Sequence, residues 1–218
     1  MTWSEIAPLL WEGAQETLYM LGVSTALTAI GGLLVGVLLV LTDRDGLLPA
    51  WPLHVVLGLI VNIGRSLPFI ILLVAIIPFT RALVGTTIGT EAAIVPLTVG
   101  AIPFFARMVE TALREVDRSV VAAATAMGAS RREIVVKVLL REARPGLVSG
   151  LTITVVALVG YSAMAGVVGG GGLGDLAIRY GYQRFEDEVM LATVAVLILF
   201  VQLVQVLGDL IARRLSHR

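Results

Sequence analysis

The sequence predicts an all-α membrane protein with five transmembrane helices and a helical insert on the cytoplasmic side. Hydrophobic residues make up 57% of the 218-residue chain and charged residues only 15%, whereas soluble domains are about 45–50% apolar and about 25% charged. The apolar residues gather in stretches long enough to cross a hydrocarbon core, which takes about 20 helical residues. Basic residues are concentrated in alternate connections between these stretches. These observations indicate a chain folded with the bilayer as its solvent.

Each apolar stretch has features that set its limits. The first is free of charge and ends at a polar turn that begins with Asp43. The second contains Arg65 and Pro68. The third is short and contains Pro96 and Pro103. We expect Pro68 and these two prolines to break or kink their helices. All five spans belong to a single transmembrane domain, residues 1–218, and are predicted at residues 18–41, 53–80, 92–108, 146–168 and 189–211.

Lysine and arginine residues set the orientation, because cytoplasmic loops carry an excess of them. The connections on one side hold only Arg81, Arg179 and Arg184. The connections on the other side, together with the C-terminal segment that ends at Arg218, hold nearly all the rest of the 16 Lys and Arg residues. The C-terminus is therefore predicted to be cytoplasmic and the N-terminus external.

The charged insert, residues 119–144, is predicted to form a pair of helices. Gly128 is placed to end the first helix in a left-handed cap. Ser130 and Glu133 fit the S-x-x-E capping box that begins a second helix. A pair of short helices joined in this way can receive motion from a soluble partner. The residues predicted to make that contact are Ala122, Ala123, Ala124, Gly128, Ala129 and Ser130.

No catalytic or cofactor-binding motif is present in the sequence. There is no G-x-x-x-x-G-K-[ST] phosphate loop and no cysteine, and the two histidines, His54 and His217, are far apart. The glycine run that opens residues 169–188 is predicted to be a flexible external turn. The spans hold almost no ionisable group of the kind that proton- or ion-coupled carriers use. We therefore expect no catalytic residue, cofactor, metal or nucleic-acid partner, and an energy source on another subunit.

Two features of the spans leave alternatives open. Arg65 either snorkels to the inner surface or faces protein as a packing or gating residue. Irregular backbone at membrane depth is tolerated where protein or water covers it, so the third and fourth spans are candidates to line a passage, although the same residues suit helix packing. The residues predicted for the passage are Pro103, Tyr161, Ser162 and Met164.

The insert resembles the E-A-A-x-x-x-G coupling loop of ABC importer permeases, with Ala122 at the glutamate position and Arg141 at the place of a later proline. The first departure removes one polar contact expected in that family. Three other segments, residues 62–81, 91–110 and 160–174, are similar to the methionine-type ABC importer permease. The resemblance extends over nearly the whole chain from Leu18 and implies the type I importer permease fold.

The resemblance also implies partners, substrate and location. The chain would form a homodimer in the inner membrane of a bacterium. It would pair with two cytoplasmic ABC ATPase subunits, which carry the ATP and Mg²⁺, and with an external substrate-binding lipoprotein. Its substrate would be methionine, as the L- and possibly also the D-enantiomer. The alternatives are a permease for another polar amino acid and a membrane scaffold without a passage of its own.

Overall fold

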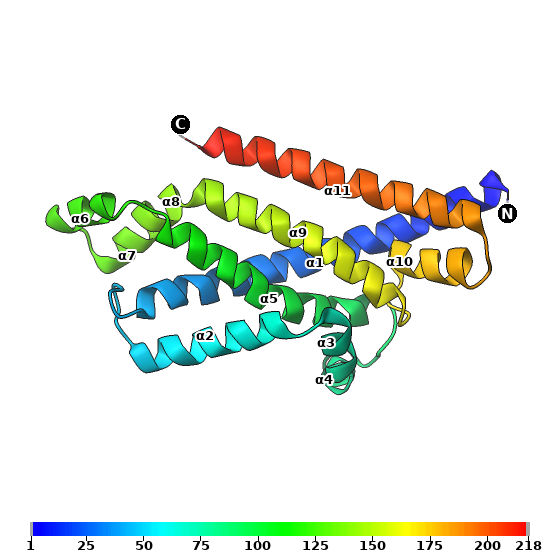
Figure 1. Ribbon diagram of the computed structural model, residues 1–218, viewed down its shortest axis with the longest axis horizontal. Helices are drawn as coiled ribbons and strands as arrows, with labels where there is room; N and C mark the ends of the chain where they lie inside the picture. The colour runs from blue at the N-terminus through cyan, green and yellow to red at the C-terminus, as the bar shows by residue number, and fades with distance from the viewer. Residues whose placement is uncertain (1, 217–218) are drawn as a thin grey trace.

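The computed structural model describes residues 2–216, and every regular element within them is helical. His217 and Arg218, considered above, lie outside the described residues. Four helices are each long and apolar enough to cross a membrane. They run side by side along the long axis of the molecule (Figure 1) and are α1 (Trp3–Thr42), α5 (Thr90–Arg114), α9 (Arg144–Gly166) and α11 (Asp187–Leu215).

Helix α1 begins at Trp3, well before the predicted start of the first span at Leu18. Its 40 residues correspond to about 60 Å, roughly twice the thickness of a hydrocarbon core. The added turns are held by packing, because Ile6 is fully buried in a cluster with Leu173, Leu176 and Val189. The first helix therefore also supports the structure at the N-terminal end of the bundle.

Helix α5 lies at the centre of the bundle and packs against α1, α2 and α9. Glycines allow the close approach of α1 to α5: a Cβ added at Gly32 would lie 2.7 Å from Phe105, and one added at Gly36 would lie 2.6 Å from Val109. Small residues permit such approach in membranes. The Gly32-x-x-x-Gly36 pattern thus serves packing within one chain.

The second apolar stretch, residues 53–80, is interrupted at Pro68, as expected, and forms three helices. It forms α2 (Trp51–Ser66), α3 (Phe69–Ala75) and α4 (Ile77–Val84), and α2 and α3 meet at an angle of 105°. The break falls at Pro68, which has no N–H to donate and disfavours a helical residue before it. Leu67 is accordingly extended, with φ −80° and ψ 126°.

The third span is not broken at its prolines, because α5 is continuous through Pro96 and Pro103. Both prolines are buried. The Pro103 ring packs on Gly64 of α2, where an added Cβ would lie 2.6 Å from the ring. Neighbouring helices make a proline tolerable within a membrane helix, and the glycine opposite Pro103 provides the necessary space.

The glycine run leaves α9 as a turn, as expected, but most of the remaining residues of the 169–188 connection are helical. The connection contains α10 (Gly172–Leu176) and the π-helix η2 (Ala177–Tyr182). The free N–H groups at the start of α10 find partners on α1: Gly172 donates to Glu16 Oε2 (2.6 Å) and Leu173 donates to Thr17 Oγ1 (2.9 Å). These two bonds satisfy donors that a helix start leaves open.

The charged insert folds into α6 (Arg118–Ala126), α7 (Arg131–Glu133), the π-helix η1 (Ile134–Leu139) and α8 (Leu140–Glu142). It projects from the end of the bundle where α11 finishes and α1 connects to α2, whereas the N-terminus and α10 lie at the opposite end (Figure 1). The basic residues of the insert therefore gather at one end of the molecule.

Candidate functional site

The turn between α6 and α7 is closed by hydrogen bonds around a left-handed glycine. Gly128 has φ +82°. The Ala129 N–H donates to the Ala124 carbonyl (3.1 Å) and the Gly128 N–H to the Thr125 carbonyl (3.0 Å). These two bonds make a Schellman motif, which satisfies carbonyls at the end of α6. The predicted left-handed cap is confirmed.

The predicted capping box at the start of α7 is also confirmed. The Glu133 N–H donates to Ser130 Oγ (3.3 Å), and the Ser130 N–H donates back to Glu133 Oε2 (3.1 Å). Lys137 lies one turn further on, with Nζ 2.9 Å from Glu133 Oε1. Hydrogen bonds from Lys137 and Ser130 lower the pKa of Glu133 to about 2. Two caps thus fix the angle between the halves of the insert.

The lowered pKa of Glu133 predicts how the insert responds to acid. A depressed carboxyl pKa stabilises the fold above the unfolded value of 4.5 and loses that effect as the pH falls toward about 2. We expect amide exchange at residues 131–137 to be constant from about pH 8 down to about pH 5, after correction for the intrinsic rate, and to accelerate below that. A Glu133→Gln variant should lack this acid-induced step. An identical step in the variant would assign it to another group.

The six predicted contact residues divide by exposure. Ala124 is buried in a cluster with Phe105, Ile134 and Leu139, so it anchors α6 to the bundle. Ala122, Ala123, Gly128 and Ser130 are exposed, and Ala129 is half-buried. The neighbouring Met127 is 82% exposed at the tip. The exposed members can meet a partner directly, whereas Ala124 positions them.

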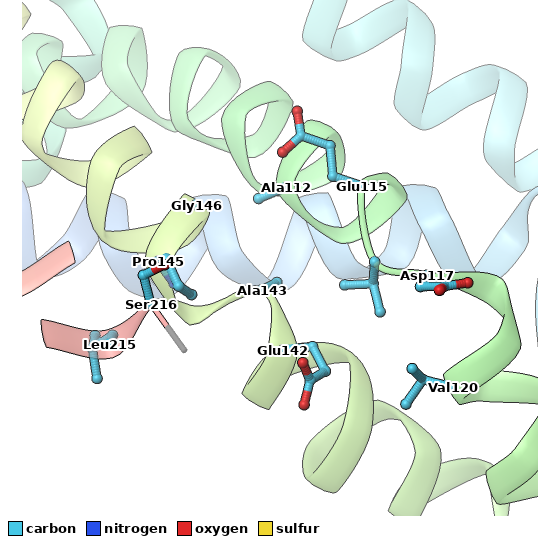
Figure 2. Close-up of a pocket in the computed structure, with 11 residues that line it drawn as sticks. Ala112, Glu115, Asp117, Val120, Glu142, Ala143, Pro145, Gly146, Leu215 and Ser216 are labelled. Atoms are coloured by element: carbon cyan, nitrogen blue, oxygen red, sulfur yellow. The ribbon is translucent and has the colours of Figure 1, made fainter. Parts of the chain in front are cut away.

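Hollows adjoin the insert at its tip and at its base. One, of about 400 Å³, lies at its tip and is lined by residues that include Met127, Gly128 and Lys137. Another, of about 480 Å³, is acidic: Glu115 comes from the end of α5, Asp117 from the N-cap of α6 and Glu142 from α8 (Figure 2). Among the described residues, no group of Asp, Glu or His is arranged to hold a metal ion. The hollows make the surface of the insert concave in places, and a protein partner can fit into them.

A polar network beneath the insert was not predicted from the sequence. Glu110 of α5 is 5% exposed and is held by two arginines: Arg107 Nη1 donates to Oε2 (2.6 Å), and Arg114 Nη2 donates to Oε1 (3.0 Å). Arg107 also donates to Asn62 Oδ1 of α2 (2.6 Å), and Arg114 pairs with Asp43 after α1 (2.7 Å). The network ties three helices together just before α6.

The four residues predicted for the passage do not share one surface. Pro103 is buried against Gly64. Ser162 is also buried, and its hydroxyl donates to the Val159 carbonyl of its own helix (2.8 Å). Tyr161 is half-buried and stacks on Phe69 with ring centroids 4.5 Å apart, whereas Met164 is 46% exposed on α9. The passage assignment stays a prediction, and Tyr161 and Met164 are the residues that reach open space.

Residues 32–218 match the family model described as binding-protein-dependent transport system inner membrane component. A probable D-methionine transport system permease protein, MetI, of Vibrio cholerae is 54% identical over 96% of this chain and 93% of its own length. The methionine import system permease protein MetP of Bacillus subtilis is 43% identical over 96% and 94%.

A solved structure shares the fold over its whole length. It is described as inward-facing conformations of the MetNI methionine ABC transporter, and it superposes with a TM-score of 0.96 at 50% identity over 100% of both chains. The 105° bend, the α10–η2 segment and the capped insert therefore belong to a backbone shared with this transporter.

Proposed function

The chain belongs to the family of binding-protein-dependent transport system inner membrane components, and from this premise we propose that it is the permease subunit of an ATP-driven methionine importer. The observation that carries the proposal is the joint similarity in sequence and backbone to methionine permeases along almost the entire chain. These similarities favour transport over a scaffold role. They also favour methionine over another polar amino acid as the substrate.

We infer that ATP is hydrolysed by a separate subunit that docks on the insert. The capped helix pair, its exposed tip and the adjoining hollows offer a rigid surface for such a partner. Lys and Arg are concentrated at this end of the bundle, which supports a cytoplasmic location for it. The opposite end, with the N-terminus and the α10–η2 segment, is then external and available to a substrate-binding lipoprotein.

The exposed face of α9 is the proposed meeting surface of two copies and the wall of the passage. Ile153, which is 52% exposed, and Met164, which is 46% exposed, are large apolar residues on this face, and Val167, directly after α9, is 56% exposed. Gly160 lies on the same face, and an added Cβ there would meet nothing within 4 Å. A large side chain at this position would therefore act only on whatever covers α9 in the assembled transporter.

Replacing Gly160 with leucine tests this face. We expect methionine uptake to fall about tenfold or more, since a misfit of 1.4 kcal/mol already changes an equilibrium tenfold. Gly58→Leu is the matched control. Gly58 also has open space around it, but its neighbours Val55, Leu59 and Ile60 are exposed and apolar, as on a lipid-facing helix. Equal uptake by the two variants in proteoliposomes would place the passage elsewhere.

The proposed function is tested by reconstitution. The permease, its ATPase and its binding protein are placed in liposomes, and uptake of labelled L-methionine is measured with ATP. We expect uptake to require all three proteins and to be reduced by unlabelled D- or L-methionine but not by other polar amino acids. Uptake of a different amino acid in preference to methionine would identify the alternative substrate, and no uptake of any amino acid would favour a scaffold.

A further inference from the structure

A cavity of about 190 Å³ lies beside the break between α2 and α3. Its residues come from four helices: Gly64 and Arg65 from α2, Phe69 and Leu72 from α3, Gly100 and Phe104 from α5, and Tyr161 from α9, together with Leu67 at the break. Gly100 and Phe104 are near the middle of α5, whose ends are Thr90 and Arg114. The cavity is therefore at the depth where transporters with broken helices commonly hold their substrates.

The polar groups of this cavity have no partner within the described chain. Arg65 and the hydroxyl of Tyr161 take part in no hydrogen bond or ion pair with residues 2–216. A charged side chain within a membrane-spanning region is costly unless it is paired or wet. An unpaired guanidinium at the edge of a mid-depth cavity thus offers five donors to an anionic group.

The remaining walls are apolar and largely aromatic. Phe69 is 7% exposed and stacks on Tyr161 with an interplanar angle of 5°, so the two rings form one firm surface. Phe104 adds a third ring, and no carboxylate lines the cavity. This combination suits a carboxylate joined to an apolar or thioether side chain, because sulfur packs favourably near aromatic rings. It disfavours a ligand with a cationic side chain.

We propose that this cavity is a substrate subsite in which Arg65 binds the carboxylate of an α-amino acid while the rings of Phe69, Phe104 and Tyr161 hold its apolar side chain. The proposal rests on the proposed function and deepens it by naming a point on the route through the chain. The cavity volume of about 190 Å³ suits one small ligand, since pockets for drug-sized ligands measure about 300–1,000 Å³.

The absence of native cysteine allows a direct test. Leu67 lines the cavity and is 43% exposed, so Leu67→Cys should react with a maleimide in the purified permease–ATPase complex. We expect L-methionine to slow this reaction. In the background of Arg65→Gln, the protecting concentration should rise roughly tenfold to a hundredfold, the loss expected for a hydrogen bond to a charged group. Methioninol, which lacks the carboxylate, should protect Leu67→Cys in the presence of Arg65 as poorly as methionine does in the Arg65→Gln background.

Further variants separate binding from folding. Arg65→Lys keeps the charge but not the fork geometry. The methionine concentration needed for protection should lie between those of the unmodified protein and Arg65→Gln. Gly100→Ala narrows the cavity from the opposite wall, because its Cβ would lie 3.1 Å from Leu72, and should weaken protection without touching a charge. Arg81→Gln removes an exposed arginine that does not line the cavity. In this background, methionine should protect Leu67→Cys as well as it does in the otherwise unmodified protein.

The outcomes distinguish this inference from the proposed function. Equal protection by methionine and methioninol, or equal protection with and without Arg65, would overturn the subsite. If the unmodified transporter takes up methionine in proteoliposomes but methionine never protects position 67, the subsite fails and the proposed function stands. If the unmodified transporter takes up no methionine, both fail.

Discussion

Replacing Gly128 with valine should release the ATPase from the permease while the membrane helices remain folded. Gly128 has φ +82°, a conformation that a β-branched residue strongly disfavours. An added Cβ would meet no atom within 4 Å, so the expected effect comes from backbone conformation and not from a clash. A left-handed residue with a side chain costs about 1–2 kcal/mol, which corresponds to a roughly fivefold to thirtyfold loss of correctly capped insert.

The measurement is co-purification of the ATPase with the permease, together with ATP hydrolysis stimulated by the binding protein. Gly128→Asn is the matched control, since asparagine tolerates the left-handed conformation and should retain most of the activity. The two variants have side chains of similar size at an exposed position. Equal assembly and hydrolysis by both would show that the Schellman cap does not control the ATPase contact.

Local signals explain which parts of the molecule the sequence predicts well. The left-handed cap at Gly128 and the box formed by Ser130 and Glu133 depend on residues within one or two turns of each other. The third, fourth and fifth spans likewise follow from their apolar composition, and their helices enclose nearly all of the predicted ranges. The family prediction, which rested on three longer segments, is confirmed by the comparisons.

Contacts between distant segments explain what the sequence does not predict. The glycine run becomes the start of a helix because Glu16 and Thr17 accept hydrogen bonds from residues 156 positions away. Pro103 leaves α5 unbroken because Gly64 of another helix makes room for its ring. Pro68 was recognised as an interruption, but the direction in which α3 leaves α2 is set by packing against α5 and α9.

The buried network around Glu110 is a further product of distant segments, and it predicts a large loss of stability. Glu110→Ala would remove the carboxylate that faces both Arg107 and Arg114 and leave two guanidinium groups near one another. Removing one partner of a buried ion pair costs about 3–5 kcal/mol. We expect about 3 kcal/mol here, because the side chain of Glu110 is 6% exposed whereas that of Arg114 is 43% exposed. In a chain of this size that loss lowers the unfolding midpoint by roughly 6–12 °C.

Thermal unfolding of the purified permease in detergent measures this effect. Asp175→Asn is the matched control, because Asp175 pairs with Arg179 at the same i,i+4 spacing but with side chains that are 19% and 55% exposed. Exposed pairs contribute about 1 kcal/mol or less, so the control should shift by only a few degrees. The double variant Glu110→Ala, Arg107→Ala should regain part of the loss, since one uncompensated charge is then removed. Equal shifts for Glu110→Ala and Asp175→Asn would contradict a buried network.

With the network intact, α1, α2 and α5 are joined directly before α6, so a force applied to the insert reaches three helices together.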